Sequence, residues 1–198
     1  QVFKAEALLR WHHPQRGTVS PAQFIPIAES TGLIIDIGEW VFQQAAQQVA
    51  QWRTRHGKNF QISINKSPVQ FHRPEKHHGA WDVHLHSLGL DGSSLAVEIT
   101  EGLLLDTNDD VTRQLQALRA SGIAISLDDF GTGHSSLTYL KQLPISRIKL
   151  DRSFIQPILH NPQDATLVRA VIALAHTLGL EVVAEGVEEE AQVRLLET

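Results

Sequence analysis

Six short apolar segments of this chain each bear a polar side chain near the C-terminal end, and this pattern limits the possible folds more than any other feature. In residues 95–99, for example, apolar side chains alternate with Ala96 and Glu98. Successive side chains of a β-strand point to opposite faces of a sheet, so each segment has one face that helices can cover and one that carries the polar group. Polar groups at the ends of several strands are typical of the mouth of a parallel barrel, where active sites lie.

Helical segments separate the six predicted strands. Ser20-Pro21 has the form of a capping-box start with proline in the first turn, and Gly32 and Gly57 are typical residues just beyond a helix end. The expected helices cover residues 20–31, 36–56, 74–88, 108–121, 135–141, 162–178 and 189 to the end. Strands that alternate with helices at this spacing predict parallel βα units.

The predicted fold class is therefore α/β, a TIM-like (β/α)8 barrel. A closed barrel of this kind has eight strands in about 250 residues, whereas about six strands can be counted in these 198 residues. We expect the barrel to be incomplete here, with its first and last strands outside this sequence. No linker or low-complexity tract divides the chain, so residues 1–198 are expected to form a single, partial domain.

Composition argues against several kinds of partner and site. The net charge of −5 leaves no basic stripe for duplex nucleic acid, and no apolar run approaches the length of a membrane span. Without cysteine there is no disulfide or thiolate zinc site, and nothing indicates an oxidising compartment, so we expect a cytoplasmic domain whose parent could be tethered to the inner membrane. We expect His12-His13, His77-His78 and the pair His84 and His86 on loops or helix surfaces, since no HExxH spacing is present.

Five oxygen-bearing side chains are expected at the mouth of the predicted barrel: Glu6, Asn65, Glu98, Asp128 and Glu185. A single acidic residue at a strand end is usually a solvated or capping group, but a set drawn from several strands is harder to explain in that way. Their charges would repel one another strongly unless a cation lay among them. Carboxylates together with an amide suit a hard divalent ion such as Mg²⁺ or Mn²⁺.

Asp129 and Lys149 extend the predicted site. Asp129 cannot point inward beside Asp128 if the strand continues, but if the strand ends at Asp128 it can turn over the rim and hold a second ion. The competing interpretation of Asp129 is a turn or helix cap before the glycine-rich loop that follows. Lys149 lies in the middle of a strand among apolar residues, which favours a site lysine over a surface lysine. These residues alone also fit a barrel enzyme that uses a lysine base beside Mg²⁺, as enolases do.

The polar segments form a series that resembles the EAL domain, the cyclic di-GMP (c-di-GMP) phosphodiesterase family. In order along the whole chain they are Glu6-Ala7-Leu8-Leu9-Arg10-Trp11, Ser63-Ile64-Asn65, Val97-Glu98-Ile99-Thr100-Glu101, Asp128-Asp129-Phe130-Gly131, Lys149-Leu150-Asp151 and Ala184-Glu185-Gly186-Val187-Glu188. Six motifs in order make the resemblance specific. Lys66 stands where the family usually has an apolar residue, which we expect to matter little, and His134 replaces a usual loop tyrosine, which could alter the order of that loop.

The resemblance implies hydrolysis of one phosphodiester bond of c-di-GMP to linear pGpG with two Mg²⁺ or Mn²⁺ ions. The implied metal ligands are Glu6, Asn65, Glu98, Asp128, Asp129, Asp151 and Glu185. The implied catalytic residues are Lys149, which would hold the attacking water, Glu185, Glu101, which would brace the loop after Asp129, and Glu188, which would support the site. Arg10 and Leu8 would contact the substrate, and Arg10 would meet one of its phosphates.

The resemblance also implies partners, and it leaves one alternative open. A homodimer is expected, as is fusion to sensory or diguanylate cyclase-type domains in the parent protein. The alternative is an impaired domain that binds c-di-GMP without cleaving it. Such a domain would be expected to have lost the first glutamate, an aspartate of the pair or the lysine, whereas Glu6, Asp128, Asp129 and Lys149 are all present. The family's terminal strands, one with a site glutamine, are not in this sequence, so we expect an active parent and an open-sided fragment.

Overall fold

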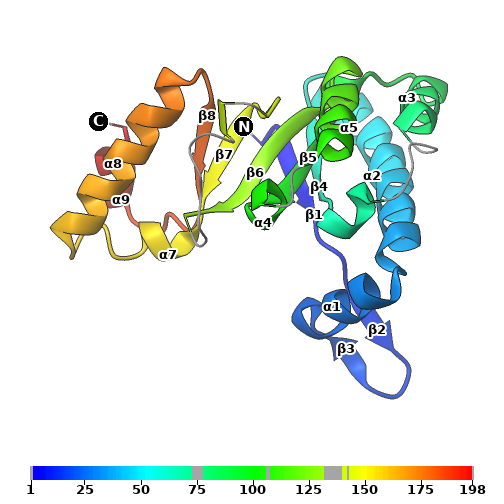
Figure 1. The fold of residues 1–198 in the computed structure, drawn as a ribbon, viewed down its shortest axis with the longest axis horizontal. Coiled ribbons are helices and arrows are strands. Elements are labelled where there is room, and N and C mark those ends of the chain that lie inside the picture. The colour runs from blue at the N-terminus through cyan, green and yellow to red at the C-terminus, as the bar shows by residue number, and fades with distance from the viewer. Residues whose placement is uncertain (1, 73–77, 106–107, 132–139, 142, 198) are drawn as a thin grey trace. The chain divides into compact units, whose positions relative to one another are not determined.

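The computed structural model describes residues 2–72, 78–105, 108–131, 140–141 and 143–197. Within these residues, six strands hydrogen-bond in the order β1-β4-β5-β6-β7-β8 (Figure 1). They are β1 Lys4–Ala7, β4 Gln61–Asn65, β5 Leu95–Thr100, β6 Ala124–Phe130, β7 Arg147–Leu150 and β8 Glu181–Ala184. The pairs β1–β4, β4–β5, β6–β7 and β7–β8 are all parallel. Parallel strands in sequential order with helical connections confirm the predicted α/β fold of the TIM-barrel type.

The chain divides into two compact units, which are described one at a time. The first unit comprises Gln1–Glu98 and Asn108–Ala124. Its helices are α1 Pro21–Thr31, α2 Ile34–His56, α3 His78–Ser87 and α5 Asp109–Ala120, with the short 3₁₀ helices η1 Pro68–Phe71 and η2 Gly92–Ser94. Helix α2 packs on β4, as Figure 1 shows, and its Phe42 and Val49 are fully buried. This packing leaves the other face of β4 for polar side chains.

A hairpin in the first unit was not predicted. Strands β2 Trp11–His13 and β3 Gly17–Val19 pair antiparallel, with His12 opposite Thr18. The expectation that His12-His13 lies on a loop or helix surface is therefore wrong. Gly17, at φ 68°, adopts the left-handed conformation that the tight connection requires. Strands of three residues are too short to show a two-residue period, which explains why the sequence pattern did not reveal them.

The helices of the first unit lie close to their predicted positions, but two predictions about individual residues in them are wrong. Helix α1 begins at Pro21 and ends before a left-handed Gly32, but Ser20 makes no side-chain capping bond, so the predicted capping box is wrong. Trp40, Phe42 and Trp52 lie at helical spacing, which predicts that all three are core residues, but Trp40 is 53% exposed. Phe42 is fully buried, as predicted, and stacks on Trp81 with ring centroids 4.1 Å apart.

The turn after β4 packs directly on α2. Ser67 caps η1, and its backbone N–H donates to the side-chain oxygen of Gln70 at 2.9 Å. The Gln70 amide lies against Gly38 of α2, where an added Cβ atom would be only 1.9 Å from Gln70 Nε2. Glycine in a helix interior is unfavourable by about 1 kcal/mol relative to alanine. Here it allows the turn that follows Asn65 to approach the helix.

The second unit comprises Ile99–Thr107 and Ile125–Thr198. Its helices are α4 Gly102–Leu105, α7 Arg152–Ile155, α8 Pro162–Thr177 and α9 Glu190–Leu196. Helix α8 packs on β8 (Figure 1), and Val168 and Ala175 are buried in this layer. Most of the helix expected over residues 135–141 lies outside the described residues, as do His134 and the loop around it. In the part of the chain that the structure describes, no helix is long and apolar enough to span a membrane.

Candidate metal and phosphodiester site

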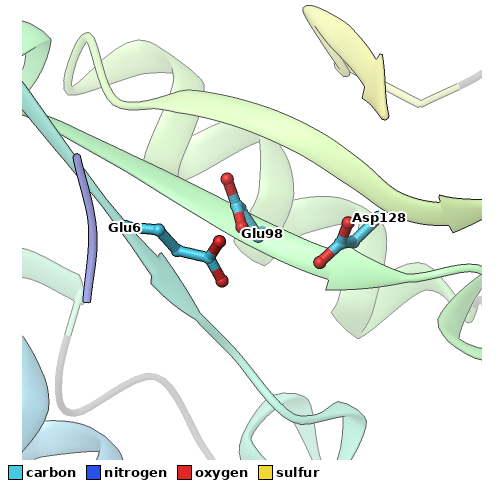
Figure 2. A group of neighbouring side chains, drawn as sticks. All are labelled: Glu6, Glu98 and Asp128. Atoms are coloured by element: carbon cyan, nitrogen blue, oxygen red, sulfur yellow. The ribbon is translucent and has the colours of Figure 1, made fainter. Parts of the chain in front are cut away.

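Three predicted ligands gather in the first unit. Glu6 lies on β1, Asn65 ends β4, and Glu98 on β5 is in register with Asn65. The side-chain amide of Asn65 donates to Glu6 Oε1 at 2.8 Å. A carboxylate oxygen of Glu6 lies within 4.8 Å of one of Glu98, and Figure 2 shows these two carboxylates side by side. These three residues therefore lie on neighbouring strands of the first unit, with their side chains close together.

The carboxylates of Glu6 and Glu98 differ in environment. Glu98 is only 2% exposed, whereas Glu6 is exposed. A buried carboxylate is costly unless its charge is compensated, and the approach of a second carboxylate increases that cost. An oxygen-rich cluster of this kind, with no sulfur ligand, is chemically suited to Mg²⁺, Mn²⁺ or Ca²⁺.

Lys149 is the centre of the cluster in the second unit. Its ammonium nitrogen lies 3.0 Å from Asp128 Oδ1 and 2.7 Å from Glu185 Oε1, and its side chain is 8% exposed. Lys149 lies on β7, between β6 and β8 in the sheet. Asp128 lies on β6 (labelled in Figure 2), and Glu185 directly follows β8. Lys149 is thus buried among acidic partners and is not a surface lysine.

The backbone at Asp129 explains how two consecutive aspartates can occupy one site. The sequence suggested that the strand must end at Asp128 for this to happen, but β6 continues to Phe130. The β6–β7 register instead shifts between Leu127 and Phe130, and Asp129 has a φ of 53°. A bulge with a left-handed residue changes the direction of a side chain without ending the strand. The N–H of Asp129 donates to Asp128 Oδ1 at 3.1 Å.

Partial burial and neighbouring negative charge raise the pKa of Asp129. Desolvation is the largest cause, followed by the charges of Asp128, Asp151 and Glu185, while the Lys149 ammonium acts in the opposite direction. The surroundings of Asp129 therefore disfavour its ionised form. A bound cation would reverse this preference.

Replacing Asp129 with asparagine should raise the melting temperature of the metal-free protein at pH 7 by about 1–2 °C, a small effect because the side chain is largely exposed. Because the folded-state pKa of Asp129 is raised, protonation of its carboxyl group stabilises the folded protein. This stabilisation is fully present below the unfolded-state pKa of 3.8 and is lost as the pH rises through the folded-state pKa. At pH 7 the ionised carboxylate is thus unfavourable, and asparagine tolerates the same left-handed backbone. Thermal melts in EDTA should show the gain shrinking from pH 7 toward pH 4. A gain that does not depend on pH would contradict this explanation.

The remaining predicted residues of the second unit have defined contacts. Asp151 Oδ1 accepts from the N–H of Ser153 at 2.9 Å and caps α7. The pKa of Asp151 is lowered first by a hydrogen bond from the Ser153 side chain and then by this backbone hydrogen bond. Glu101 is buried, and its Oε2 accepts from the N–H of Gly131 at 3.3 Å, two residues after Asp129. Glu188 has an exposed side chain, and its backbone N–H donates to Gln192 Oε1 at 2.8 Å.

The two predicted substrate contacts, Leu8 and Arg10, lie in the first unit. Both are exposed, and together with Glu6 and Trp40 they line a groove of about 450 Å³. Arg10 also borders a neighbouring hollow of about 650 Å³, whose lining includes Trp11. Trp11 packs edge-on against Phe24, with ring centroids 5.7 Å apart. Arg10 donates to the carbonyl oxygen of Leu9 at 2.9 Å.

Lys66, directly after Asn65, has a buried side chain. Its ammonium nitrogen lies 4.6 Å from the Phe71 ring centroid and 4.9 Å from that of Trp81. Burial lowers the pKa of Lys66 to about 8, and the charge of Glu39 partly opposes this shift. The family usually has an apolar residue here, and the aromatic surroundings of Lys66 explain how a lysine fits the same position.

A parallel α/β sheet with carboxylates, an amide and a buried lysine at the carboxyl ends of its strands defines a barrel-type protein with a site suited to divalent metal ions. The chain belongs to the EAL domain family, whose model matches residues 1–198. The resemblance stated from six sequence motifs is thereby confirmed. Family membership also removes the basis for the enolase-like alternative.

The chain is similar to segments of longer signalling proteins. It is 46% identical over 198 residues to the bifunctional diguanylate cyclase/cyclic di-GMP phosphodiesterase MucR of Pseudomonas aeruginosa, covering 98% of this chain and 28% of MucR. It is 39% identical over 196 residues to the oxygen sensor protein DosP of Escherichia coli, covering 99% of this chain and 24% of DosP. The chain thus spans about a quarter of the length of these relatives.

Solved structures of relatives have the same fold. A structure described as the PaMucR phosphodiesterase in complex with c-di-GMP matches with a TM-score of 0.87 and 45% identity, covering 97% of this chain and 77% of that one. The FimX EAL domain of Pseudomonas aeruginosa bound to c-di-GMP matches with a TM-score of 0.85 and 25% identity, covering 96% of this chain and 76% of that one. These matches confirm the TIM-like barrel class of the fold.

Proposed function

We propose that this chain is the catalytic part of a phosphodiesterase that hydrolyses c-di-GMP to linear pGpG with two divalent ions. The observation that carries the proposal is the buried Lys149 between Asp128 and Glu185. The Glu6–Asn65–Glu98 cluster supports it, because two carboxylates and an amide oxygen lie together there and suit a divalent ion. The choice of c-di-GMP as the substrate is supported by relatives named as c-di-GMP phosphodiesterases, such as PdeR of Escherichia coli at 39% identity.

The residues fit the metal ions chemically. Every proposed ligand offers oxygen, and the acidic side chains far outnumber the single lysine. The proposed ligands of the two ions are Glu6, Asn65 and Glu98 in the first unit and Asp128, Asp129, Asp151 and Glu185 in the second unit. When bound, the ions supply Lewis-acid chemistry at the phosphodiester and activate water near neutral pH.

The chain's own residues bind and orient the reactants. Lys149 would hold the attacking water by hydrogen bonding and stabilise negative charge that develops on it. Water oxygen bonds to phosphorus, the bond from phosphorus to the 3′ oxygen breaks, and that oxygen takes up a proton, which gives linear pGpG. Arg10 would bind a phosphate and Leu8 would contact the nucleotide, while Glu101 would brace the backbone after Asp129 through Gly131.

The direct test uses the full-length protein after metal removal with EDTA. We expect no change in c-di-GMP without added metal and stoichiometric formation of pGpG after addition of Mg²⁺ or Mn²⁺, followed by liquid chromatography. Binding of c-di-GMP is measured in parallel by calorimetry. If the metal-loaded protein binds the dinucleotide but leaves it uncut, the receptor function replaces hydrolysis as the explanation.

We further propose that the protein works in the cytoplasm as a homodimer, fused to sensory or diguanylate cyclase-type domains. The fusion is supported by relatives several times longer than this chain, one of which is named as bifunctional.

A further inference from the structure

Gln192 in the second unit has a buried side chain that satisfies three backbone groups. It is 4% exposed. Its Oε1 accepts from the N–H groups of Glu188 at 2.8 Å and Glu189 at 3.0 Å, and its Nε2 donates to the carbonyl oxygen of Ile155 at 3.1 Å. None of the motifs singled out in the sequence includes this residue.

The three backbone groups belong to two different segments, a loop and a short helix, each of which follows or contains a proposed metal ligand. Glu188 and Glu189 end the loop that begins with Glu185, directly after β8. Ile155 ends α7, the short helix that begins after its capping residue Asp151. The side-chain amide of Gln192 therefore links, by hydrogen bonds, the loop that carries Glu185 and the helix α7 that Asp151 caps.

Helix capping explains only part of this arrangement. Gln192 forms a capping box with Glu189 at the start of α9, and glutamine or glutamate serves equally well in that motif. The bond to the Ile155 carbonyl needs an N–H donor, which glutamate lacks. Only a side chain with both an acceptor and a donor makes the full set of contacts.

We propose that Gln192 is a positioning residue for the metal-binding loops, because it fixes the Glu185 loop against the end of α7 and so sets Glu185 relative to Asp151. This inference rests on the proposed metal-dependent phosphodiesterase function. Residues that orient metal ligands typically contribute 10- to 100-fold to metal affinity or activity. Small displacements of catalytic groups reduce turnover more than substrate binding.

Two variants of the full-length protein separate positioning from capping. Gln192→Glu keeps the acceptor for Glu188 and Glu189 but removes the donor to Ile155, and Gln192→Leu removes both. Gln163→Glu, at an exposed position of α8, is the matched control for the added charge. The measurements are Mg²⁺ affinity by calorimetry, kcat and KM for c-di-GMP, and amide hydrogen exchange at Glu188 and Glu189.

We expect both Gln192 variants to bind Mg²⁺ about 10-fold more weakly and to lose kcat about 10-fold or more, with KM within about twofold. Amide exchange at Glu188 and Glu189 should accelerate in Gln192→Leu and stay near the wild-type rate in Gln192→Glu. Wild-type Mg²⁺ affinity and kcat in Gln192→Glu would overturn the proposal and leave a capping role alone. If the wild type itself cleaves nothing, the Mg²⁺ affinities still decide the positioning role.

Discussion

The Lys149→Met variant is expected to lose c-di-GMP hydrolysis by about 10³-fold or more while still binding the dinucleotide. Methionine has nearly the length of lysine but has no charge and no hydrogen-bond donor. The wild-type ammonium lies within 3.0 Å of both Asp128 Oδ1 and Glu185 Oε1. General acid–base groups contribute about 10²–10⁴-fold to rate, and donors to developing charge about 10²–10³-fold. Steady-state kinetics with saturating Mg²⁺ measures the loss.

The control for Lys149→Met is Lys58→Met, which removes an exposed lysine between α2 and β4. It should keep wild-type kcat and KM. Circular dichroism and thermal melts with Mg²⁺ present show whether the Lys149 variant is folded. A folded Lys149→Met protein that retains more than about a tenth of wild-type kcat would exclude the proposed role in holding the attacking water.

The Glu98→Gln variant should bind Mg²⁺ at least about 100-fold more weakly and hydrolyse c-di-GMP about 10³-fold more slowly. The substitution keeps the size of a side chain that is 2% exposed, so the packing around β5 is preserved. It removes the negative charge that lies within 4.8 Å of the Glu6 carboxylate. Neutralising one of two adjacent carboxylates weakens the attraction for a dication, whereas the amide can still offer one oxygen.

Calorimetry with Mg²⁺ and with Mn²⁺ measures the effect of Glu98→Gln directly. Glu197→Gln, at an exposed position after α9, is the charge-matched control and should leave both affinities unchanged. Raising the Mg²⁺ concentration should partly restore the rate of the Glu98 variant, because its main defect is in metal binding. Undiminished metal affinity would mean that Glu98 is not a ligand.

Strand residues were well predicted because two physical signals coincided. Side chains on the helix-facing face of β5, β6 and β7 had to be apolar, so Glu98, Asp128 and Lys149 stood out as exceptions on the opposite face. The resemblance to the family motifs then implied that Glu98 and Asp128 are metal ligands and that Lys149 is a catalytic residue of the same reaction. Burial of Lys149 followed from its apolar neighbours along the strand.

Features that depend on tertiary contacts were missed. The shifted register at Asp129 breaks the two-residue period on which the strand prediction depended, so a pattern of alternation could not show it. Helical spacing predicts both Trp40 and Phe42 as core residues, but only Phe42 is buried, and Trp40 lines a groove in the first unit. Gln192 had no signal, because one glutamine in the first turn of a short helix is common, and only its three partners reveal its importance.

The close approach of Gln70 to Gly38 has a consequence for engineering more stable versions of this protein. Ranking substitutions by intrinsic helix preference would select alanine at position 38, because glycine is the weakest helix former apart from proline. The methyl group would occupy the place of the Gln70 amide, so the flexible end of this side chain would have to move away from the N–H of Ser67 that it accepts from. The gain in helix preference at position 38 would therefore be offset by the loss of this contact at the start of η1, and helix preference alone is a poor guide for redesign at this position.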